Sequence, residues 1–243
     1  MKRCDGRDFN EVREISITRG FTSKTPGSVL IRAGETMILC TASLSASLPP
    51  WMNPDEARGW TTAEYNMLPG STSPRKGRDR AGKIDGRSVE IQRLVGRSLR
   101  AAIDLKALGP RMLNVDCDVL QADGGTRTLS VTGAAVAAID ALRSLEEFAN
   151  RLPGDPGFPM KSFLAAVSVG IVDGVPLLDL CYEEDAKAEV DMNIVMTDAD
   201  RFVEVQGTGE EATFSENQLA QMLGLAKKGI HELIAKQKAL FCQ

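Results

Sequence analysis

The spacing of hydrophobic residues changes several times along this 243-residue chain, and the order of those changes limits the folds that it can adopt. An apolar stripe from Ile91 to Ile103 recurs at helical spacing and predicts a helix. Alternating or β-branched apolar runs elsewhere predict strands. Strands are expected over 12–19, 28–33, 36–44, 62–68, 112–120, 163–172, 175–182, 185–191, 193–196 and 201–205, with further helices over 128–147 and from Ser215 onward.

The resulting order is strands, helix, strand, helix, strands, helix. It is typical of an α+β protein with two similar βαβα-like halves, and because no segment has the composition of a linker we expect a single domain over 1–243. Hydrophobic residues make up 43% of the chain and charged residues 26%, which excludes a disordered or fibrous protein.

Two absences from the sequence bear on location and chemistry. No apolar run approaches the roughly 18 residues that span a bilayer, and the first residues are charged, so we expect a cytoplasmic protein without a membrane partner. The five cysteines form no CxxC pair, which indicates reduced thiols and no zinc site. The one histidine, His231, rules out a histidine-rich metal centre, and we interpret it as structural.

A basic loop interrupts a chain whose net charge is −4. Residues 69–86 contain five basic and two acidic residues, a local net charge of +3, and no apolar period. Such a loop is suited to contacts with a nucleic-acid backbone, although a solvated run of charge is a common alternative. The candidate RNA-binding residues are Arg75, Arg78 and Arg80.

A turn with two glycines precedes the second predicted helix and is a candidate anion site. Gly124 and Gly125 permit a tight turn, and the free N–H groups of the helix start favour an anion beside Thr126 and Arg127. An ordinary strand-to-helix turn is the alternative. Arg87 lies in the first turn of the preceding helix, where the helix dipole disfavours a cation unless an anion is bound. Its alternative is an arginine whose stem covers apolar surface.

An acidic stretch follows in the second half, with six carboxylates and one lysine between 179 and 191. Asp179 falls within an apolar run, where a carboxylate requires a partner or a cation. Asp185 follows a predicted turn at 183–184 that could bring it back towards Asp179, and such a pair suits Mg²⁺. An acidic, solvated hairpin tip is the alternative, which explains Glu183 and Glu184 better than Asp179.

Six segments together resemble the ribonuclease PH family of phosphate-dependent 3′-to-5′ exoribonucleases, nearly from end to end. None is decisive alone, but the combination is highly specific. The segments are RCDGR at 3–7, GWTTAEYNMLP at 59–69, GRSVEIQRLVGRSLR at 86–100, DCDVLQADGGTR at 116–127, LDLCYEED at 178–185 and EVDMNIVM at 189–196.

The resemblance implies a ribosomal protein S5 domain 2-like fold and a homohexameric ring, a trimer of dimers. It also implies a role for each candidate residue. These are phosphate binding by Arg87, Gly125, Thr126 and Arg127, catalysis and binding of Mg²⁺ or Mn²⁺ by Asp179 and Asp185, and tRNA binding by Arg75, Arg78 and Arg80.

The implied reaction is phosphorolysis of tRNA precursors and other RNA 3′ ends, in which inorganic phosphate as co-substrate releases nucleoside diphosphates and the reverse reaction adds nucleotides. Gly70 stands where the family often has a basic residue, which bears on the tRNA contacts and not on the phosphate site. The alternatives are an exosome-type catalytic subunit, a polynucleotide phosphorylase core, or a non-catalytic RNA-binding ring subunit of an exosome-like complex. The last is expected to have lost an arginine or an aspartate of the site.

Overall fold

The computed structural model describes residues 3–53, 55–78, 85–210 and 212–242, which form two β-sheets with helices packed between and beside them. The first sheet has the strand order β1-β2-β3-β5-β4 and the second β7-β6-β8-β9. Among the strand pairs of the described residues, β4 and β5 alone run parallel, and the crossover connection that a parallel pair needs runs through a helix. The strands are β1 Ile15–Arg19, β2 Gly27–Ala33, β3 Thr36–Ser45, β4 Trp60–Met67, β5 Met112–Gln121, β6 Leu164–Val172, β7 Val175–Leu178, β8 Val190–Thr197 and β9 Phe202–Gly209.

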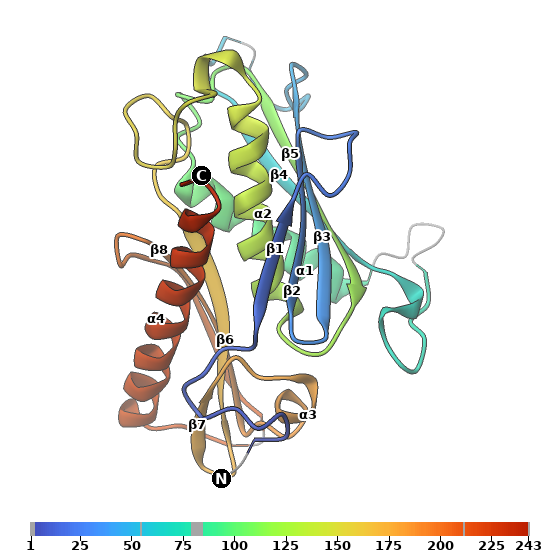
Figure 1. Cartoon of the computed structure of the whole chain (residues 1–243), viewed down its shortest axis with the longest axis vertical. Helices are drawn as coiled ribbons and strands as arrows, with labels where there is room; N and C mark the ends of the chain where they lie inside the picture. Colours follow the sequence, from blue (N-terminus) through green and yellow to red (C-terminus); the bar gives the residue numbers. More distant parts are fainter. Residues whose placement is uncertain (1–2, 54, 79–84, 211, 243) are drawn as a thin grey trace.

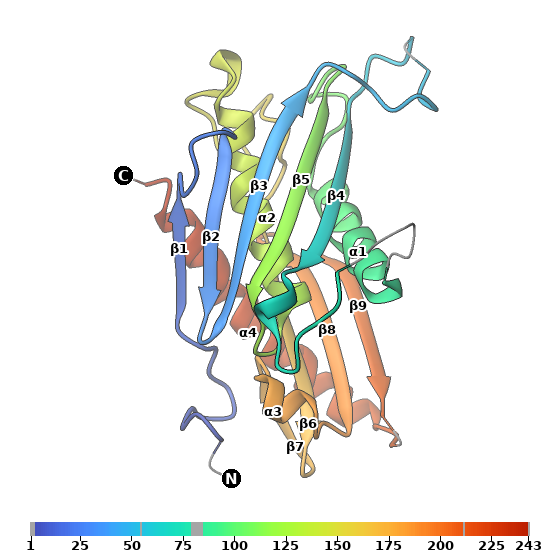
Figure 2. The same cartoon turned by 90° about the vertical axis from the view of Figure 1, so that its right-hand side faces the viewer.

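Two helices lie between the sheets and join the two halves of the chain (Figures 1 and 2). Helix α1 (Gly86–Ala102) packs on β4, and α2 (Thr126–Arg143) packs on β2 and β3 on one side and on β6 on the other. The long helix α4 (Glu216–Ala239) lies against β6 and β7. One continuous hydrophobic cluster therefore includes residues of both sheets.

Helix α2 is buried almost all round, because apolar strands face it on both sides. Its alanines and Gly133 allow close approach. A Cβ atom at Gly133 would lie 2.7 Å from both the Cys40 Sγ atom and the Ile31 Cγ2 atom. The small residues of this segment thus set the distance between helix and sheet, and with it the position of the turn before the helix.

The α+β class and the hairpin at Asp173–Gly174 agree with the sequence analysis, but several boundaries differ. Helix α2 covers Thr126–Arg143 instead of 128–147. Strand β7 ends at Leu178 instead of 182, and a short helix α3 (Tyr182–Asp185) stands where a turn was expected at 183–184. The backbone leaves the strand because Asp179 has a left-handed φ of 55°. The strand expected over 185–191 was wrong, because one strand, β8, begins only at Val190 and continues through the strand expected over 193–196. No helix in the described part of the chain could cross a membrane.

Candidate functional site

The turn before α2 is packed directly against the start of α3. Gly124 and Gly125 have φ values of 73° and 63°, which glycine adopts without strain. A Cβ atom at Gly124 would lie 2.7 Å from the carbonyl oxygen of Leu180, so only glycine fits there. The backbone N–H of Tyr182 donates to the Asp123 Oδ1 atom at 3.2 Å. These contacts place α3 beside the N-terminus of α2.

The N-terminus of α2 has the properties of an anion site. Gly125 is the N-cap and has no side chain to satisfy the free N–H groups of the first turn. The hydroxyl of buried Thr126 accepts a hydrogen bond from the Tyr65 hydroxyl at 2.9 Å, which leaves its own proton available to a ligand. The positive end of the helix dipole adds to the attraction for an anion.

Arg127 is held by side chains from two other elements. Its Nη1 atom donates to Glu90 Oε1 on α1 at 3.1 Å and to Gln206 Oε1 on β9 at 3.2 Å. Arg87 is exposed in the first turn of α1, and Asp85 is the N-cap of this helix. Both Arg87 and Arg127 act electrostatically on Asp185. The charges of both predicted phosphate-binding arginines therefore lower the pKa of the same carboxyl group.

Asp185 is the last residue of α3 and is half-buried. Burial raises the pKa of this carboxyl above its ordinary value, while Arg87 and Arg127 act in the opposite direction. Its backbone N–H donates to the carbonyl of Cys181 at 2.9 Å, which fixes the helix turn. The result is an acid beside two cations that do not fully compensate the cost of its burial.

Asp191 on β8 is a second carboxyl of this cluster, and sequence reasoning did not assign it a role. Burial, followed by the charge of Asp185, raises the pKa of Asp191 to about 6, although Arg127 opposes the shift. Asn193 donates to its Oδ2 atom at 3.2 Å. The available signal was the polar pair Asp191 and Asn193 in an otherwise apolar strand. The structure thus brings Asp185 together with Asp191.

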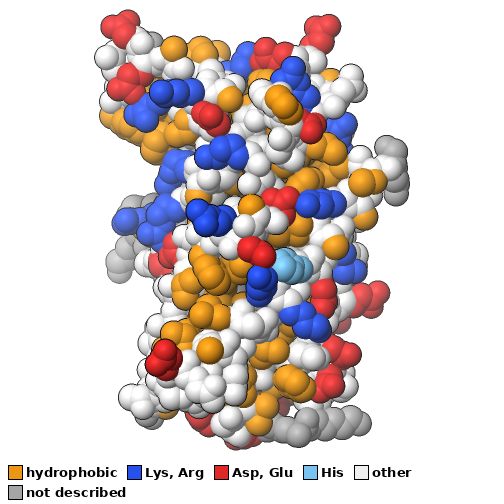
Figure 3. All heavy atoms as spheres, turned by 90° about the vertical axis from the view of Figure 1, so that its left-hand side faces the viewer, with side chains coloured by type: hydrophobic (Ala, Val, Ile, Leu, Met, Phe, Trp, Pro, Cys, Tyr) orange, Lys and Arg blue, Asp and Glu red, His pale blue; other side chains and the backbone are white. Residues whose placement is uncertain are grey.

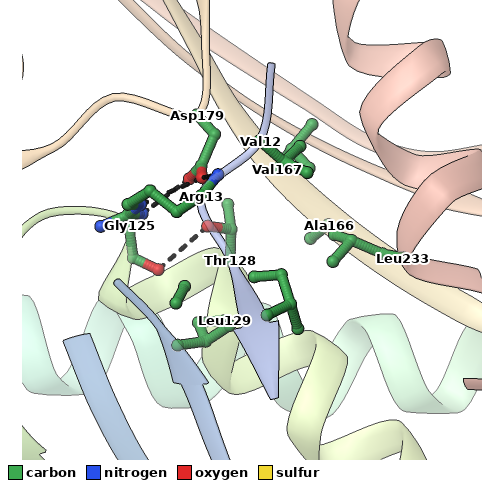
Figure 4. A pocket seen from close by; sticks show the side chains of 11 residues that line it. Val12, Arg13, Gly125, Thr128, Leu129, Ala166, Val167, Asp179 and Leu233 are labelled. Atoms are coloured by element: carbon green, nitrogen blue, oxygen red, sulfur yellow. Dashed lines mark hydrogen bonds and ion pairs between the residues drawn. The ribbon is translucent and has the colours of Figure 1, made fainter. Parts of the chain in front are cut away.

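Asp179 has different surroundings from those the sequence analysis expected. Arg13 donates from Nη2 to Oδ1 at 2.6 Å, and from Nε and the backbone N to Oδ2 at 3.0 and 2.8 Å (Figure 4). The Arg7 Nη1 atom lies 3.5 Å from Oδ2. Burial alone would raise the pKa of Asp179, but Arg13 and Arg7 hold it below its ordinary value. The expectation that Asp179 lies within a strand was wrong, since β7 ends one residue earlier.

The acidic tip is only partly solvated. Glu183 is exposed and pairs with Lys187 at 2.8 Å, as a solvated tip would. Glu184 is buried, and both its carboxylate oxygens accept hydrogen bonds from Arg3, at 2.8 and 2.7 Å. The sequence analysis noted Arg3 and Arg7 only as part of the RCDGR segment and gave Arg13 no role. No local pattern in the sequence marks these long-range pairs.

The basic loop lies between β4 and α1. Arg75 and Arg78 are exposed, and Arg80 lies outside the described residues. The Lys76 Nζ atom lies 2.6 Å from an oxygen of Asp85, the residue that caps α1 just before Arg87. The loop is therefore tied to the start of the helix that carries Arg87.

His231 lies apart from the cluster, on the surface of α4 (Figure 3). Its Nε2 atom lies 2.6 Å from an oxygen of Asp200, and the side chains of both residues are 47% exposed. An exposed pair of this kind fits the structural interpretation of the histidine.

Comparison with known proteins gives matches along almost the whole chain. Residues 11–143 match the model of the 3′ exoribonuclease family, domain 1, and residues 162–229 match domain 2 of the same family. The chain is 54% identical over 236 residues to ribonuclease PH of Rhodopirellula baltica, covering 96% of this chain and 95% of that protein. It is 55% identical over 238 residues to ribonuclease PH of Corynebacterium efficiens, covering 98% and 95%.

Two solved structures share the fold of this chain. The Archaeoglobus fulgidus exosome with RNA bound to the active site has a TM-score of 0.78 and 25% identity, covering 97% of this chain and 92% of that chain. Rice Rrp46 also has a TM-score of 0.78, at 17% identity over 98% of this chain and 100% of that one, which shows the shared fold alone. From the family matches and the sequence identities together, the chain belongs to the 3′ exoribonuclease family, in its ribonuclease PH group.

Proposed function

We propose that Arg87, Arg127, Asp185, Asp191 and the N-terminus of α2 form the active site of this phosphate-dependent 3′-to-5′ exoribonuclease. The observation that carries the proposal is that the charge of Arg127 acts on two carboxyls, Asp185 and Asp191, whose pKa values are both raised. Arg87 also acts on Asp185, and the uncapped start of α2 packs against the helix that carries Asp185. Such a cluster combines cations that can bind an anionic nucleophile with acids that can protonate a leaving group. Perturbed titratable groups are typical of active sites.

The basic half of the cluster binds inorganic phosphate. Arg87 and Arg127 donate charge-assisted hydrogen bonds to its oxygens, and the N–H groups of the α2 start and the Thr126 hydroxyl donate to the others. A phosphate oxygen then attacks the phosphorus of the terminal phosphodiester. The new P–O bond forms as the bond from phosphorus to O3′ of the preceding nucleotide breaks, which gives a nucleoside diphosphate and an RNA shortened by one nucleotide.

The acidic half supplies the proton that this step requires. The departing O3′ oxygen becomes a hydroxyl, so it takes up one proton. Burial raises the pKa of Asp185, which makes its carboxyl a better proton donor near neutral pH than an exposed aspartic acid. Asp185 is therefore the general acid that we propose, and in the reverse reaction the same carboxylate accepts the proton.

Asp185 and Asp191 also fit a divalent cation such as Mg²⁺ or Mn²⁺. Each of the two carboxyls is disfavoured in its ionised form, and the charge of Asp185 contributes to the raised pKa of Asp191, so a cation between them would relieve the repulsion. Asp179 fits less well, because Arg13 already donates to both its oxygens. We therefore propose Asp191 in place of Asp179 as the partner of Asp185. A bound cation would neutralise charge on the attacked phosphate.

RNA 3′ ends, including those of tRNA precursors, are the proposed substrates, and the exposed Arg75 and Arg78 support backbone contacts. We propose a homohexamer that presents several such loops to one RNA. Phe202 and Val205 support an assembly, because both are about half exposed on the edge strand β9. The five free cysteines accord with a cytoplasmic enzyme. A non-catalytic ring subunit is not favoured, since the arginines and aspartates are all present.

The test is the release of labelled nucleotide from RNA over a range of phosphate concentrations. We expect nucleoside diphosphates as products and no release without phosphate. Arg127→Ala removes charge-assisted hydrogen bonds and should weaken phosphate affinity by about ten- to hundredfold. Arg93→Ala, at an exposed arginine of α1, is the matched control and should be unchanged. Release of nucleoside monophosphates, or equal phosphate affinity in both variants, would contradict the assignment.

A further inference from the structure

Two cysteines far apart in the sequence meet beside α3. The Sγ atoms of Cys4 and Cys181 lie 3.1 Å apart, although 177 positions separate the residues. Cys4 is exposed and Cys181 is 5% exposed, so a solution reagent can reach one thiol of the pair and the other lies directly behind it. The proposed phosphorolysis uses neither thiol.

The ion pair next to these thiols holds them in place. Arg3 directly precedes Cys4, and its guanidinium donates to both oxygens of Glu184 and to the backbone carbonyls of Leu178 and Asp179. The Glu184 side chain also accepts a hydrogen bond from the backbone N–H of Cys181 at 3.1 Å. The N-terminal segment and the start of α3 are thus locked together on either side of the sulfur pair.

Metal binding explains this cluster poorly. Cys4, Cys181 and Glu184 do place possible ligand atoms within 4.8 Å of one another. However, both Glu184 oxygens already accept hydrogen bonds from Arg3, and the guanidinium charge would repel a second cation at the same place. Covalent sulfur chemistry requires neither of those oxygens.

The other cysteines lack this combination of access and proximity. Cys40 and Cys117 lie opposite each other on β3 and β5, but their exposed fractions are 0% and 1%, so a solution reagent does not reach them. Cys242 is exposed near the C-terminus. It serves as an internal measure of how readily an exposed thiol of this protein reacts.

We propose that Cys4 and Cys181 are a redox-active pair that closes into a reversible disulfide on reaction with a low-molecular-weight disulfide such as oxidised glutathione. The Cys4 thiolate attacks one sulfur of the reagent, forms a mixed disulfide and releases one glutathione thiolate. The Cys181 sulfur then attacks Cys4 Sγ and breaks the mixed disulfide, and its proton goes to the second departing glutathione. Overall, two protein thiols are oxidised and one reagent disulfide is reduced to two thiols.

The disulfide would restrain the element that carries the proposed acid. It joins the N-terminal segment to the residue before α3, and Asp185 is the last residue of that helix. Because the bond closes a loop of most of the chain, it restricts the unfolded state strongly. We therefore expect the oxidised form to unfold at a higher temperature than the reduced form.

The experiment treats the full chain carrying Cys242→Ser with oxidised glutathione and measures intact mass and peptide maps. We expect the loss of two hydrogens, a Cys4–Cys181 linked peptide, an upward shift of the unfolding midpoint and full reversal by dithiothreitol. With Cys181→Ser added, Cys4 should instead keep a glutathione adduct. With Cys4→Ser added, no modification should form.

Two results would overturn the proposal. One is a stable glutathione adduct on Cys4 while Cys181 is present, which would show that the second sulfur does not attack. The other is an unmodified Cys4 under conditions in which the wild-type Cys242 is fully glutathionylated.

Discussion

Asp179 and Asp185 are six positions apart in the sequence, yet the structure gives them opposite surroundings. Asp179 is buried against Arg13, which donates three hydrogen bonds to its carboxylate, and its pKa is lowered. Asp185 is half-buried near two arginines, and its pKa is raised. In the first pair the charges are matched and stabilise the fold. In the second the matching is incomplete, which leaves the group available for chemistry.

The ion pair of Arg13 and Asp179 also supports the backbone of the proposed phosphate site. The Arg13 Nη1 atom donates to the backbone carbonyl of Asp123 at 2.6 Å, within the turn that opens the phosphate site. Thr36 donates to the carbonyl of Gly124 at 2.8 Å. The same arginine that neutralises Asp179 therefore fixes the backbone from which Thr126 and Arg127 extend.

The largest expected effect is on stability, from removing the matched cation. Arg13→Met leaves the Asp179 carboxylate buried without its main partner, which costs about 3–5 kcal/mol. Urea unfolding at pH 7 measures this. Glu147→Gln is the control, since it breaks a pair with Arg111 whose side chains are 34% and 52% exposed, and it should cost at most about 1 kcal/mol. Similar losses in both variants would remove the distinction between the two regions.

The next effect is on phosphate affinity, through Arg87 of the proposed active site. Arg87→Ala should raise the phosphate concentration for half-maximal rate by about ten- to hundredfold, because one charge-assisted hydrogen bond is worth about 1.5–3 kcal/mol. Its folding stability should be unchanged, since Arg87 is exposed. Steady-state kinetics with varied phosphate, alongside the Arg93→Ala control, provide the measurement. A loss of stability without a change in phosphate dependence would show that Arg87 stabilises the fold and does not bind phosphate.

Asp191→Asn should raise the free energy of unfolding at pH 7, whereas Arg13→Met should lower it. Folding raises the pKa of Asp191 to about 6, so the stability that this group contributes is present below its unfolded pKa near 4 and is lost as pH rises through 6. The variant should therefore gain about 1–2 kcal/mol at pH 7, after allowance for partial exposure, and nothing near pH 4. Urea midpoints from pH 4 to 8 measure this. A variant less stable than the parent at pH 7 would show that neighbouring groups fully compensate the cost of burying the Asp191 charge.

Mg²⁺ offers a companion measurement. If Asp191 and Asp185 hold the cation, millimolar Mg²⁺ should raise the unfolding midpoint of the parent protein, because a ligand that binds only the native state stabilises it. The rise should be smaller in Asp191→Asn. Equal rises in both proteins would place the cation elsewhere.

The smallest expected effect concerns RNA capture. Replacing Arg75 and Arg78 with alanine removes two exposed cations and should flatten the log–log salt slope of tRNA-precursor binding by about 1.4 for single-stranded contacts. Filter binding over a salt series measures the slope. Phosphorolysis of a short unstructured oligonucleotide should change little. Equal losses on both substrates would mean that the loop takes part in the chemistry.

The sequence predicted the elements whose side chains follow a local period. The stripe from Ile91 to Ile103 and the hairpin at Asp173–Gly174 correspond closely to the structure. The partner of Asp179 was not predictable in this way, because Arg13 lies 166 positions away and is part of a segment that reads as an alternating strand. The role of Asp191 was not predictable either, because a single carboxylate in a strand has no motif of its own, and the packing of α3 against the α2 turn brings Asp185 to it.

The most direct test of the contrast between the two regions compares Asp179→Asn with Asp185→Asn in one experiment. Urea midpoints and single-turnover rates at saturating phosphate and Mg²⁺ are measured for both, with Glu183→Gln as the exposed control on α3. We expect Asp185→Asn to have a midpoint equal to or above that of the parent, because the burial of its carboxylate is not fully compensated, and to lose about 10²–10⁴-fold in rate, the usual share of a general acid. Asp179→Asn should lose stability and keep more of its rate per folded molecule. An unchanged midpoint with a lost rate in Asp179→Asn, and the reverse in Asp185→Asn, would contradict the account.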